Sequence, residues 1–562
     1  MKNSPKPFRL AATRRIVRAA CLALFCLLLG VAENGGFTGL PADIFLRLDP
    51  LAGIAVPLAA REIIVSLIPA LGVVLAAVFA GRIFCGWVCP MGTTLDAAGS
   101  LVRWKRLGRK TDPVPRCLKY GILAAILAAA LLGVNMAFWA SPIPLVTRLY
   151  ALVLHPLGLL GLDGALAVSA PVMEQMGSTD LQYRFPILRG YAAVWFVALF
   201  WLGLIALERI RPRFWCRYLC PAGALLGLFS RLAPPFSWKR RTPHSCNACG
   251  RCAAQCPAGI LHDDPSVTDV SECLTCRACE TACKRKSIRF GLPGPLETAD
   301  GPADGFRSGQ NTRTLSRRAL SRRAFCGSAA AGAALAGVSY FETAGQALEG
   351  TAGKNQGSLI RPPGSVPEID FLARCVRCGE CMKACPTGGL QPAGLQAGFS
   401  GMFSPFLDPR SGPCAPDCAA CGSVCPSRAI QALPLEEKRW AKIGTAAVDR
   451  KLCLAWAEDK RCMVCKETCP YGAVSVVPHE GHIAPVPVVR HERCYGCGFC
   501  ERHCPTATAA VRVDPIGALR QHDPAFETAA KNAGLELDPS QHAVEHPEYN
   551  PQNDGAPPGF LD

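Results

Sequence analysis

The sequence lacks several motifs that define common redox proteins and enzymes. It contains no Cys-x-x-Cys-His motif, so covalently attached c-type haem is not expected. It also lacks a P-loop, a glycine-rich dinucleotide fingerprint, and any nucleophile with a recognisable base beside it. These absences exclude the usual signatures of ATPases, nicotinamide dehydrogenases and hydrolases. Any redox chemistry therefore has to come from other residues.

Cysteine is the residue type that stands out among those present. The 562 residues include 32 cysteines, most of them two or three residues apart and often followed by proline. Small disulfide-rich domains seldom space cysteines in this way, so we interpret the clusters as metal ligands. The net charge of +17 does not indicate a nucleic-acid partner, because the basic residues gather beside hydrophobic segments.

Half of the residues are hydrophobic, and four apolar stretches have the length of a membrane-spanning helix. None of the four contains histidine, so a haem b with two histidine ligands is not expected. Basic residues concentrate before the first stretch and after the second and fourth, which places these connections and the N-terminus in the cytoplasm. A cleaved signal peptide is the alternative for the first stretch. The four stretches are residues 16–32, 63–84, 120–140 and 191–207.

A further apolar segment, residues 152–172, lies between the third and fourth stretches. It contains Pro156 and three glycines, so we expect it at the outer surface or as a re-entrant segment. The alternative is an extra span, which would reverse the orientation of everything after it. His155 and Asp163 in this region are candidates for accepting protons, and a solvated or capping role is the simpler interpretation of both.

Two copies of a Cys-x-x-x-Cys-Pro motif follow the second and fourth stretches. The first is RIFCGWVCPMG and the second is RFWCRYLCPAG. Cysteines at i and i+4 share a helical face, so the two pairs converge if the hairpins pack side by side. Four convergent thiolates can hold a metal cluster or cycle between thiol and disulfide, whereas the alternative role is packing as small apolar residues. The four residues are Cys85, Cys89, Cys216 and Cys220.

A tandem cysteine motif follows the fourth stretch. CNACGRCAAQCP and CLTCRACETACK repeat the C-x2-C-x2-C-x3-C spacing of bacterial ferredoxins. Three thiolates on one loop bind three irons of a [4Fe–4S] cube, and the fourth cysteine binds the neighbouring cube. Zinc needs only four ligands and seldom uses such a run. We predict one cluster on Cys246, Cys249, Cys252 and Cys283, and another on Cys273, Cys276, Cys279 and Cys256.

The same spacing returns four times beyond residue 360, with longer first gaps in the second and third copies. Each copy predicts one more [4Fe–4S] cluster, which makes six in the chain. The spacing leaves the pairing open between two arrangements: first with fourth and second with third, or consecutive copies. The predicted ligands are Cys375, Cys378, Cys381, Cys385, Cys414, Cys418, Cys421, Cys425, Cys453, Cys462, Cys465, Cys469, Cys494, Cys497, Cys500 and Cys504.

An export-type signal lies in the middle of the chain. The residues SRRAF at 321–325 are close to a twin-arginine signal, and an Ala/Gly-rich apolar stretch follows to about Phe341. A basic helix start is the alternative interpretation. We expect a crossing here that carries the C-terminal region outside, with the segment either cleaved near Ala347 or kept as an anchor.

These features predict an α-helical membrane domain combined with α+β bacterial-ferredoxin-like domains. The predicted units are a four-helix transmembrane domain (1–240), a two-cluster ferredoxin domain (241–290), a linker (291–315), a twin-arginine signal or anchor helix (316–347), a four-cluster domain (348–515) and a polar tail (516–562).

Residues 1–290, with their apolar stretches, paired motifs and tandem ferredoxin module, resemble the membrane ferredoxin-type proteins NapH and MauN. Residues 315–510 resemble the exported ferredoxin-type proteins NapG and MauM, so the chain resembles a fusion of the two. The resemblance implies an electron carrier of the bacterial inner membrane, acting as a component of a quinol dehydrogenase. Its electrons would pass from the quinol pool to a periplasmic reductase, such as nitrate reductase, or to a c-type cytochrome.

Two alternative functions remain open at this point. The chain could be an accessory protein that supplies electrons for the maturation of a periplasmic metalloenzyme. It could also be a subunit of an inward-facing oxidoreductase, if the C-terminal domain stays in the cytoplasm.

Overall fold

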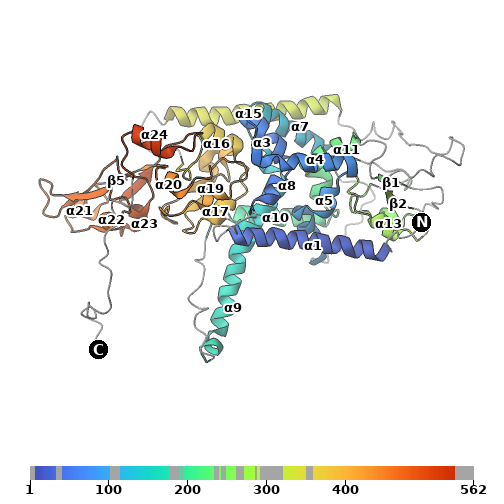
Figure 1. Cartoon of the computed structure of the whole chain (residues 1–562), viewed down its shortest axis with the longest axis horizontal. Helices are drawn as coiled ribbons and strands as arrows, with labels where there is room; N and C mark the ends of the chain where they lie inside the picture. The colour runs from blue at the N-terminus through green and yellow to red at the C-terminus, as the bar shows by residue number, and fades with distance from the viewer. Residues whose placement is uncertain are drawn as a thin grey trace.

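Three parts of the chain follow one another along the long axis of the computed structural model (Figure 1). A helical part occupies the middle, the C-terminal lobe lies at one end, and the small module with the tandem cysteine motif lies at the other. The structure describes residues 7–32, 41–101, 114–175, 190–191, 194–232, 239–241, 249–260, 271–284, 288–291, 321–349 and 359–537.

Proline and glycine set the ends of helices in the central part. The helix α4 (Pro69–Ala80) begins with a proline, which suits a first turn, and ends before Gly81, whose φ is 66°. The predicted span at 63–84 is therefore divided into shorter elements. The others are α1 (Pro7–Val31), α2 (Ile44–Arg47), α3 (Ala52–Ala60), η2 (Val65–Leu67), α5 (Ile83–Trp87), α6 (Pro90–Leu101), α7 (Leu118–Leu131), η3 (Ala137–Trp139), α8 (Pro142–Leu149), η4 (Tyr150–Leu154), α9 (His155–Gln175), α10 (Val194–Glu208), η5 (Trp215–Leu219) and α11 (Pro221–Arg231).

Helix length gives limited support to four membrane crossings. One helical run, Pro142–Ala165, is long and apolar enough to cross a membrane, and the bent pair Val65–Ala80 and Ile83–Leu101 makes a second if it counts as one span. The helices α7 and α10, which correspond to the third and fourth predicted spans, are apolar but shorter. In the described part of the chain, helix length alone therefore does not establish four crossings.

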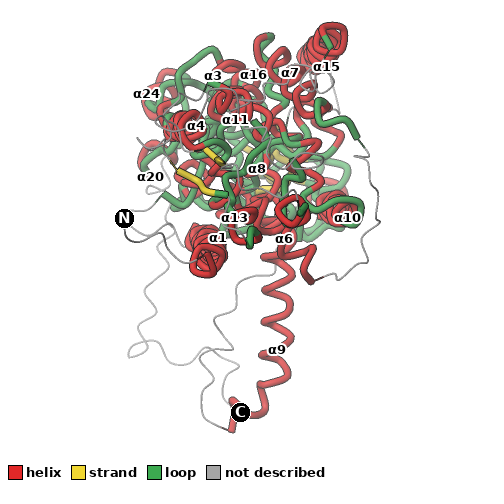
Figure 2. Tube along the Cα trace, turned by 90° about the vertical axis from the view of Figure 1, so that its right-hand side faces the viewer, coloured by secondary structure: helices red, strands yellow, loops and turns green. Residues whose placement is uncertain are grey.

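Residues 152–165 of the segment at 152–172 belong to this long helical run, which has the length that the extra-span alternative requires and differs from the expected outer-surface or re-entrant segment. The π-helical turn η4 continues directly into α9, and Pro156 is the second residue of α9, where proline is tolerated. The helix α9 projects from the side of the helical part in both views (Figures 1 and 2). Asp163 is exposed on this projecting helix.

The segment with the twin arginines forms one long helix, α15 (Arg322–Glu349). It packs along α7 on one side of the helical part, while α1 runs along the opposite side (Figure 1). Gly332 permits the close approach, because an added Cβ would lie 2.1 Å from the carbonyl oxygen of Ala125. Tyr340 also donates a hydrogen bond of 2.6 Å to the carbonyl oxygen of Leu132.

The module and the C-terminal lobe contain short helices and two-stranded antiparallel sheets, the α+β pattern expected for them. The paired strands are β1–β2, β3–β4, β5–β8 and β6–β7, and their residues are given in the next sentence. The module contains β1 (Lys239–Arg241), α12 (Arg251–Ala254), α13 (Ala278–Ala282) and β2 (Arg289–Gly291); the lobe contains α16 (Glu368–Arg374), α17 (Glu380–Ala384), β3 (Leu390–Pro392), η7 (Leu395–Ala397), α18 (Gly398–Gly401), β4 (Pro405–Leu407), α19 (Ala420–Ser423), α20 (Leu435–Lys438), β5 (Thr445–Val448), α21 (Leu454–Ala457), α22 (Val464–Glu467), β6 (Val474–Val477), β7 (Val486–Val489), α23 (Phe499–Arg502), β8 (Val511–Asp514) and α24 (Phe526–Asn532).

Candidate iron–sulfur sites

The first and second cysteine sets of the C-terminal lobe exchange their last members. The helices α17 and α19 pack together, and Cys425 comes close enough for its charge to act on Cys378 and Cys381. In return, Cys385 lies close to Cys414 in the loop of the second set. The resulting groups are Cys375, Cys378 and Cys381 with Cys425, and Cys414, Cys418 and Cys421 with Cys385.

The third and fourth sets make the same exchange where α22 and α23 pack. Cys469 lies within electrostatic range of Cys500, and Cys504 lies within range of Cys465. Consecutive sets are therefore paired, which is one of the two arrangements that the spacing left open. The groups are Cys494, Cys497 and Cys500 with Cys469, and Cys453, Cys462 and Cys465 with Cys504.

The two pairs of groups are joined directly. The backbone N–H of Cys414 in the first pair donates a hydrogen bond of 2.8 Å to the carbonyl oxygen of Cys497 in the second. Tyr471 and Tyr495 stack beside this junction, with ring centroids 4.9 Å apart and planes 1° from parallel. The four groups of the lobe thus form a continuous series.

These thiols are buried or half-buried, and several of their sulfurs accept hydrogen bonds from backbone N–H groups. Burial raises the pKa of the Cys465 thiol to about 12, so iron would have to displace a proton there. Backbone N–H groups donate to several sulfurs, which favours a charged sulfur. These contacts are Ala446 to Cys494 at 3.2 Å, Ala473 to Cys469 at 3.3 Å, Ala510 to Cys504 at 3.3 Å and Ile430 to Cys425 at 3.5 Å.

Among the described residues, no three His, Cys, Asp or Glu side chains converge closely enough to hold a single metal ion. The sulfurs around a cube stand farther apart than the ligands of one ion, because each sulfur binds a different iron. When bound, a [4Fe–4S] cluster supplies one-electron redox chemistry, and the cysteines of this chain fix its place.

The small module with the tandem cysteine motif contains the remaining predicted cluster ligands. The helices α12 and α13 pack together and bury Cys252 and Cys279, and the other cysteines lie around the same small core. Cys249 is exposed, and Cys246 lies outside the described residues. The cysteines around the core are Cys252, Cys256, Cys273, Cys276, Cys279 and Cys283.

The two Cys-x-x-x-Cys-Pro motifs contact each other through a reciprocal pair of arginines. Arg82 stands three residues before the first cysteine of one motif, and its Nη2 lies 3.5 Å from the carbonyl oxygen of Cys216. Arg213 holds the matching position in the other motif, and its Nη1 lies 3.4 Å from the carbonyl oxygen of Cys85. Both arginines are buried. Sequence reasoning missed them, although an arginine at the same position of both copies was a visible signal.

The four thiols of these motifs lie together. Cys85 and Cys216 lie near both Cys89 and Cys220, so all four sulfurs share one region. Cys220 caps the N-terminus of α11, where its sulfur accepts the N–H of Gly223 at 3.3 Å. Cys85 also packs against the core of the ferredoxin module, so this four-thiol site connects that module to the helical part.

The ferredoxin module docks on the helical part through one buried carboxylate. Glu272 accepts hydrogen bonds from Arg82 at 3.1 Å, Lys119 at 2.5 Å and Tyr120 at 3.1 Å. Lys119 and Arg82 are 0% and 2% exposed, so Glu272 compensates two buried cations. The indole of Trp87 also donates to the carbonyl oxygen of Thr275 at 3.1 Å.

The C-terminal lobe docks on the opposite end of the helical part, beside its first cysteine set. Asn135 Nδ2 donates to the carbonyl oxygen of Cys375 at 3.3 Å, and Arg377 Nη1 donates to the carbonyl oxygen of Asn135 at 3.0 Å. Arg148 Nε donates to the carbonyl oxygen of Arg377 at 3.1 Å. The guanidinium of Arg377 also lies 3.9 Å from the ring centroid of Phe138. The contact is therefore built from buried polar pairs.

Three family models match the chain, and all of them describe iron–sulfur domains. A 4Fe-4S binding domain matches residues 63–109 and 193–243, which contain the two Cys-x-x-x-Cys-Pro motifs. Another 4Fe-4S binding domain matches residues 371–391, and a 4Fe-4S dicluster domain matches residues 460–508. Together with the grouped cysteines, these matches define an iron–sulfur protein with ferredoxin-type domains, as the spacing predicted.

Curated relatives narrow this class to a family. The methylamine utilization ferredoxin-type protein MauM of Paracoccus denitrificans (strain Pd 1222) is 39% identical over 176 residues, which are 30% of this chain and 77% of MauM. The ferredoxin-type protein NapG of Escherichia coli (strain K12) is 33% identical over 182 residues, 31% of this chain and 78% of NapG. The chain therefore belongs to the family of MauM and NapG ferredoxin-type proteins.

A longer stretch resembles a different protein. Protein NirI of Paracoccus denitrificans (strain Pd 1222) is 30% identical over 274 residues, which are 47% of this chain and 34% of NirI. No solved structure matches the chain. The predicted resemblance to NapG and MauM is confirmed, whereas these comparisons do not extend to a NapH-like first half.

Proposed function

We propose that this chain is an iron–sulfur electron carrier of the bacterial inner membrane, which takes electrons from the quinol pool and passes them to a periplasmic reductase or c-type cytochrome. The observation that carries the proposal is that the two cysteine-rich parts of the chain, the C-terminal lobe and the module, lie at opposite ends of an apolar helical part (Figure 1). Family membership supports iron–sulfur electron transfer. The quinol donor and the acceptor are part of the proposal.

In this proposal the chain holds six [4Fe–4S] clusters. The four groups of the C-terminal lobe hold four clusters in a series, which suits single-electron transfer over a distance. The module holds two clusters with the exchanged ligands given by its sequence, Cys246 included. The four-thiol site formed by Cys85, Cys89, Cys216 and Cys220 acts as a redox dithiol pair or as a further cluster site, between the module and the helical part.

The proposed topology has crossings at α1, α4, α7 and α10, with the module in the cytoplasm and the C-terminal lobe in the periplasm. The helix α15 would be the return crossing, and its close packing on α7 through Gly332 supports a retained anchor. The domain limits at residues 240, 290, 315, 347 and 515 belong to this proposal, as does an origin by fusion of a NapH-like and a NapG-like protein.

The proposal predicts that a quinol reduces the clusters of the purified chain. Anaerobic protein would be mixed with decylubiquinol or menadiol while the iron–sulfur absorbance is followed, and we expect bleaching that ferricyanide reverses. Dithionite serves as the control for total reducible cluster. A chain that dithionite bleaches and neither quinol does would instead act as the accessory reductant of a metalloenzyme client, or take its electrons from a cytoplasmic donor.

A reporter at the C-terminus separates the periplasmic from the cytoplasmic placement of the lobe. Alkaline phosphatase is active only when exported and a fluorescent protein of the standard type only when retained. We expect phosphatase activity from the full chain. Fluorescence without phosphatase activity would reassign the lobe to the cytoplasm and leave the iron–sulfur assignment intact.

A further inference from the structure

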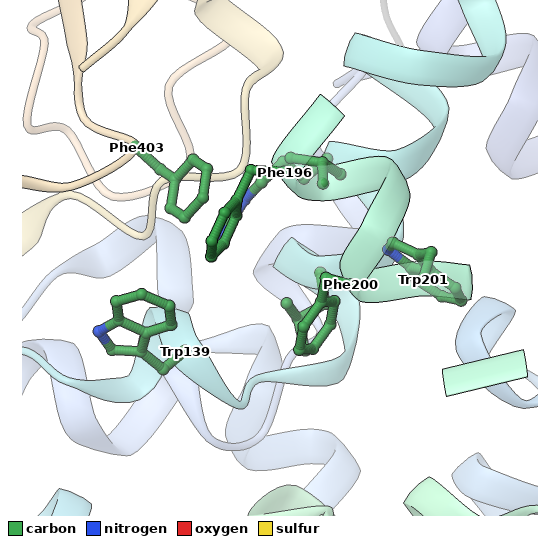
Figure 3. Close-up of a pocket in the computed structure, with 8 residues that line it drawn as sticks. Trp139, Phe196, Phe200, Trp201 and Phe403 are labelled. Atoms are coloured by element: carbon green, nitrogen blue, oxygen red, sulfur yellow. The ribbon is translucent and has the colours of Figure 1, made fainter. Parts of the chain in front are cut away.

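A pocket lies where the C-terminal lobe meets the helical part. The space between its lining residues, with the adjoining open solvent included, is about 300 Å³. Figure 3 shows Phe403 from the lobe facing Trp139 and Phe196 of the helical part, with Phe200 on the same helix as Phe196. The ring centroid of Phe403 lies 6.1 Å from that of Trp139 and 5.6 Å from that of Phe196. Neither half of the chain forms this pocket alone.

The lining is apolar and aromatic except for one cation. Arg148 is 3% exposed and lines the pocket, with its guanidinium 4.5 Å from the ring centroid of Phe403. Its Nε and Nη2 donate to the carbonyl oxygens of Arg377 and Phe138, each at 3.1 Å. Within the described residues, Nη1 has no hydrogen-bond acceptor. An apolar, aromatic lining with one directed donor suits an aromatic ring that carries a carbonyl or hydroxyl oxygen.

A strongly apolar surface adjoins one wall of the pocket. The pocket residue Phe196 stands on α10, and its neighbours Trp195 and Leu199 are 64% and 58% exposed. These exposed side chains belong to one of the apolar helices of the proposed membrane domain. An occupant that enters from this side therefore arrives from the lipid phase rather than from water.

The pocket touches both redox regions of the chain. On one side, Arg148 holds the carbonyl oxygen of Arg377 at 3.1 Å, between Cys375 and Cys378 in sequence. On the other side, Phe200 makes an edge contact with Trp215, with centroids 6.3 Å apart, and Trp215 directly precedes Cys216 of the four-thiol site. A redox-active occupant would therefore lie between the first cluster group of the lobe and the four-thiol site.

Two residues at or beside this pocket have strained backbone conformations. Phe403 and Arg377 both adopt left-handed conformations, with φ of 62° and 49°, which side chains other than glycine rarely accept. The N–H of Phe403 is held by the carbonyl oxygen of Ala393 at 2.8 Å. Such strain persists where the surrounding structure fixes a residue, and it is concentrated at functional sites.

We propose that this pocket binds the head group of the membrane quinol, with Arg148 Nη1 as the donor to one of its ring oxygens. The inference rests on the proposed function and assigns a location to its quinol site. Oxidation breaks the two O–H bonds of the quinol and yields the quinone. Its two electrons pass one at a time to clusters of the lobe, and its two protons leave to water. If the quinol binds at this end of the helical part, its electrons reach the lobe without crossing the membrane by way of the cytoplasmic module.

Filling the pocket tests the assignment. Val197→Trp on α10 would occupy the space beside Phe200, and Leu202→Trp is the matched control, because Leu202 stands exposed on the same helix outside the lining. We expect V197W to slow quinol-driven bleaching of the full chain about tenfold or more, with dithionite bleaching and iron content unchanged. L202W should keep the wild-type rate. Arg148→Met should slow the same step, and Arg148→Lys should restore part of it.

Photolabelling of the wild-type chain with an azido-substituted quinone makes the result independent of folding defects. We expect the label on peptides that contain Trp139, Phe196 or Phe403. Wild-type protein that fails to bleach with quinol overturns the proposed function, whereas labelling of these peptides would still support the pocket. Normal quinol rates in V197W, or labelling only at other peptides, would overturn the pocket and leave the proposed function standing.

Discussion

Replacing Cys425 with alanine is expected to remove the cluster whose other ligands belong to a different cysteine set. The residue follows the second set in sequence, but the structure places it beside Cys378 and Cys381 of the first. Alanine is chosen because a serine oxygen could still bind iron. The variant should lose about four irons per chain, and quinol-driven reduction should fall sharply, because the lost cluster lies nearest the proposed quinol pocket.

A double variant makes this test specific for the pairing. If Cys378 and Cys425 hold the same cluster, C378A/C425A loses no more iron than either single variant, whereas C378A/C504A loses about twice as much. The opposite pattern would establish pairing of the first set with the fourth. Cys326→Ala is the matched control, because Cys326 is exposed on α15 and belongs to none of the groups.

Glu272→Gln is expected to destabilise the docking of the ferredoxin module by about 3–5 kcal/mol. Removal of the carboxylate leaves Arg82 and Lys119 buried together without a counter-charge. Thermal unfolding of the detergent-solubilised chain would measure the change. Glu280→Gln is the control, because Glu280 pairs with Arg277 at a half-buried surface and its substitution should cost at most about 1 kcal/mol.

The same carboxylate predicts a pH dependence. Burial opposes ionisation, but Lys119 and Arg82 outweigh it and hold the pKa of Glu272 below its usual range. The stability that Glu272 contributes is therefore present above the ordinary pKa of about 4.3 and is lost as the pH falls through the lower, folded-state pKa. The wild-type chain should lose stability in acid more steeply than E272Q. Parallel pH profiles for the two proteins would contradict this role.

Cysteine spacing could predict which loops would hold clusters, because three thiolates on one loop are a local feature of the chain. It could not decide which loop receives each fourth cysteine. That choice depends on contacts such as α17 with α19, between segments about forty residues apart. The four-thiol site was foreseen from the repeat, since both copies end a hairpin. The reciprocal contacts of Arg82 and Arg213 were not predicted, because they form only between the two folded copies.

The helices were harder to predict than the cysteine groups. Hydropathy indicated a continuous span over 63–84, but Pro69 and Gly81 divide it into shorter elements. Hydropathy also gave no reason to join Phe403 to Trp139, because the two residues lie in different parts of the chain and meet only across the docked lobe. A pocket made by two domains leaves no local signal in the sequence.

Counting iron and acid-labile sulfide in the anaerobically purified full-length chain tests the central claim most directly. The account predicts about 24 iron atoms and an equal amount of sulfide per polypeptide, because each of six cubes contains four of each. A preparation with intact chain but about eight irons, or with zinc in place of iron and sulfide, would contradict it.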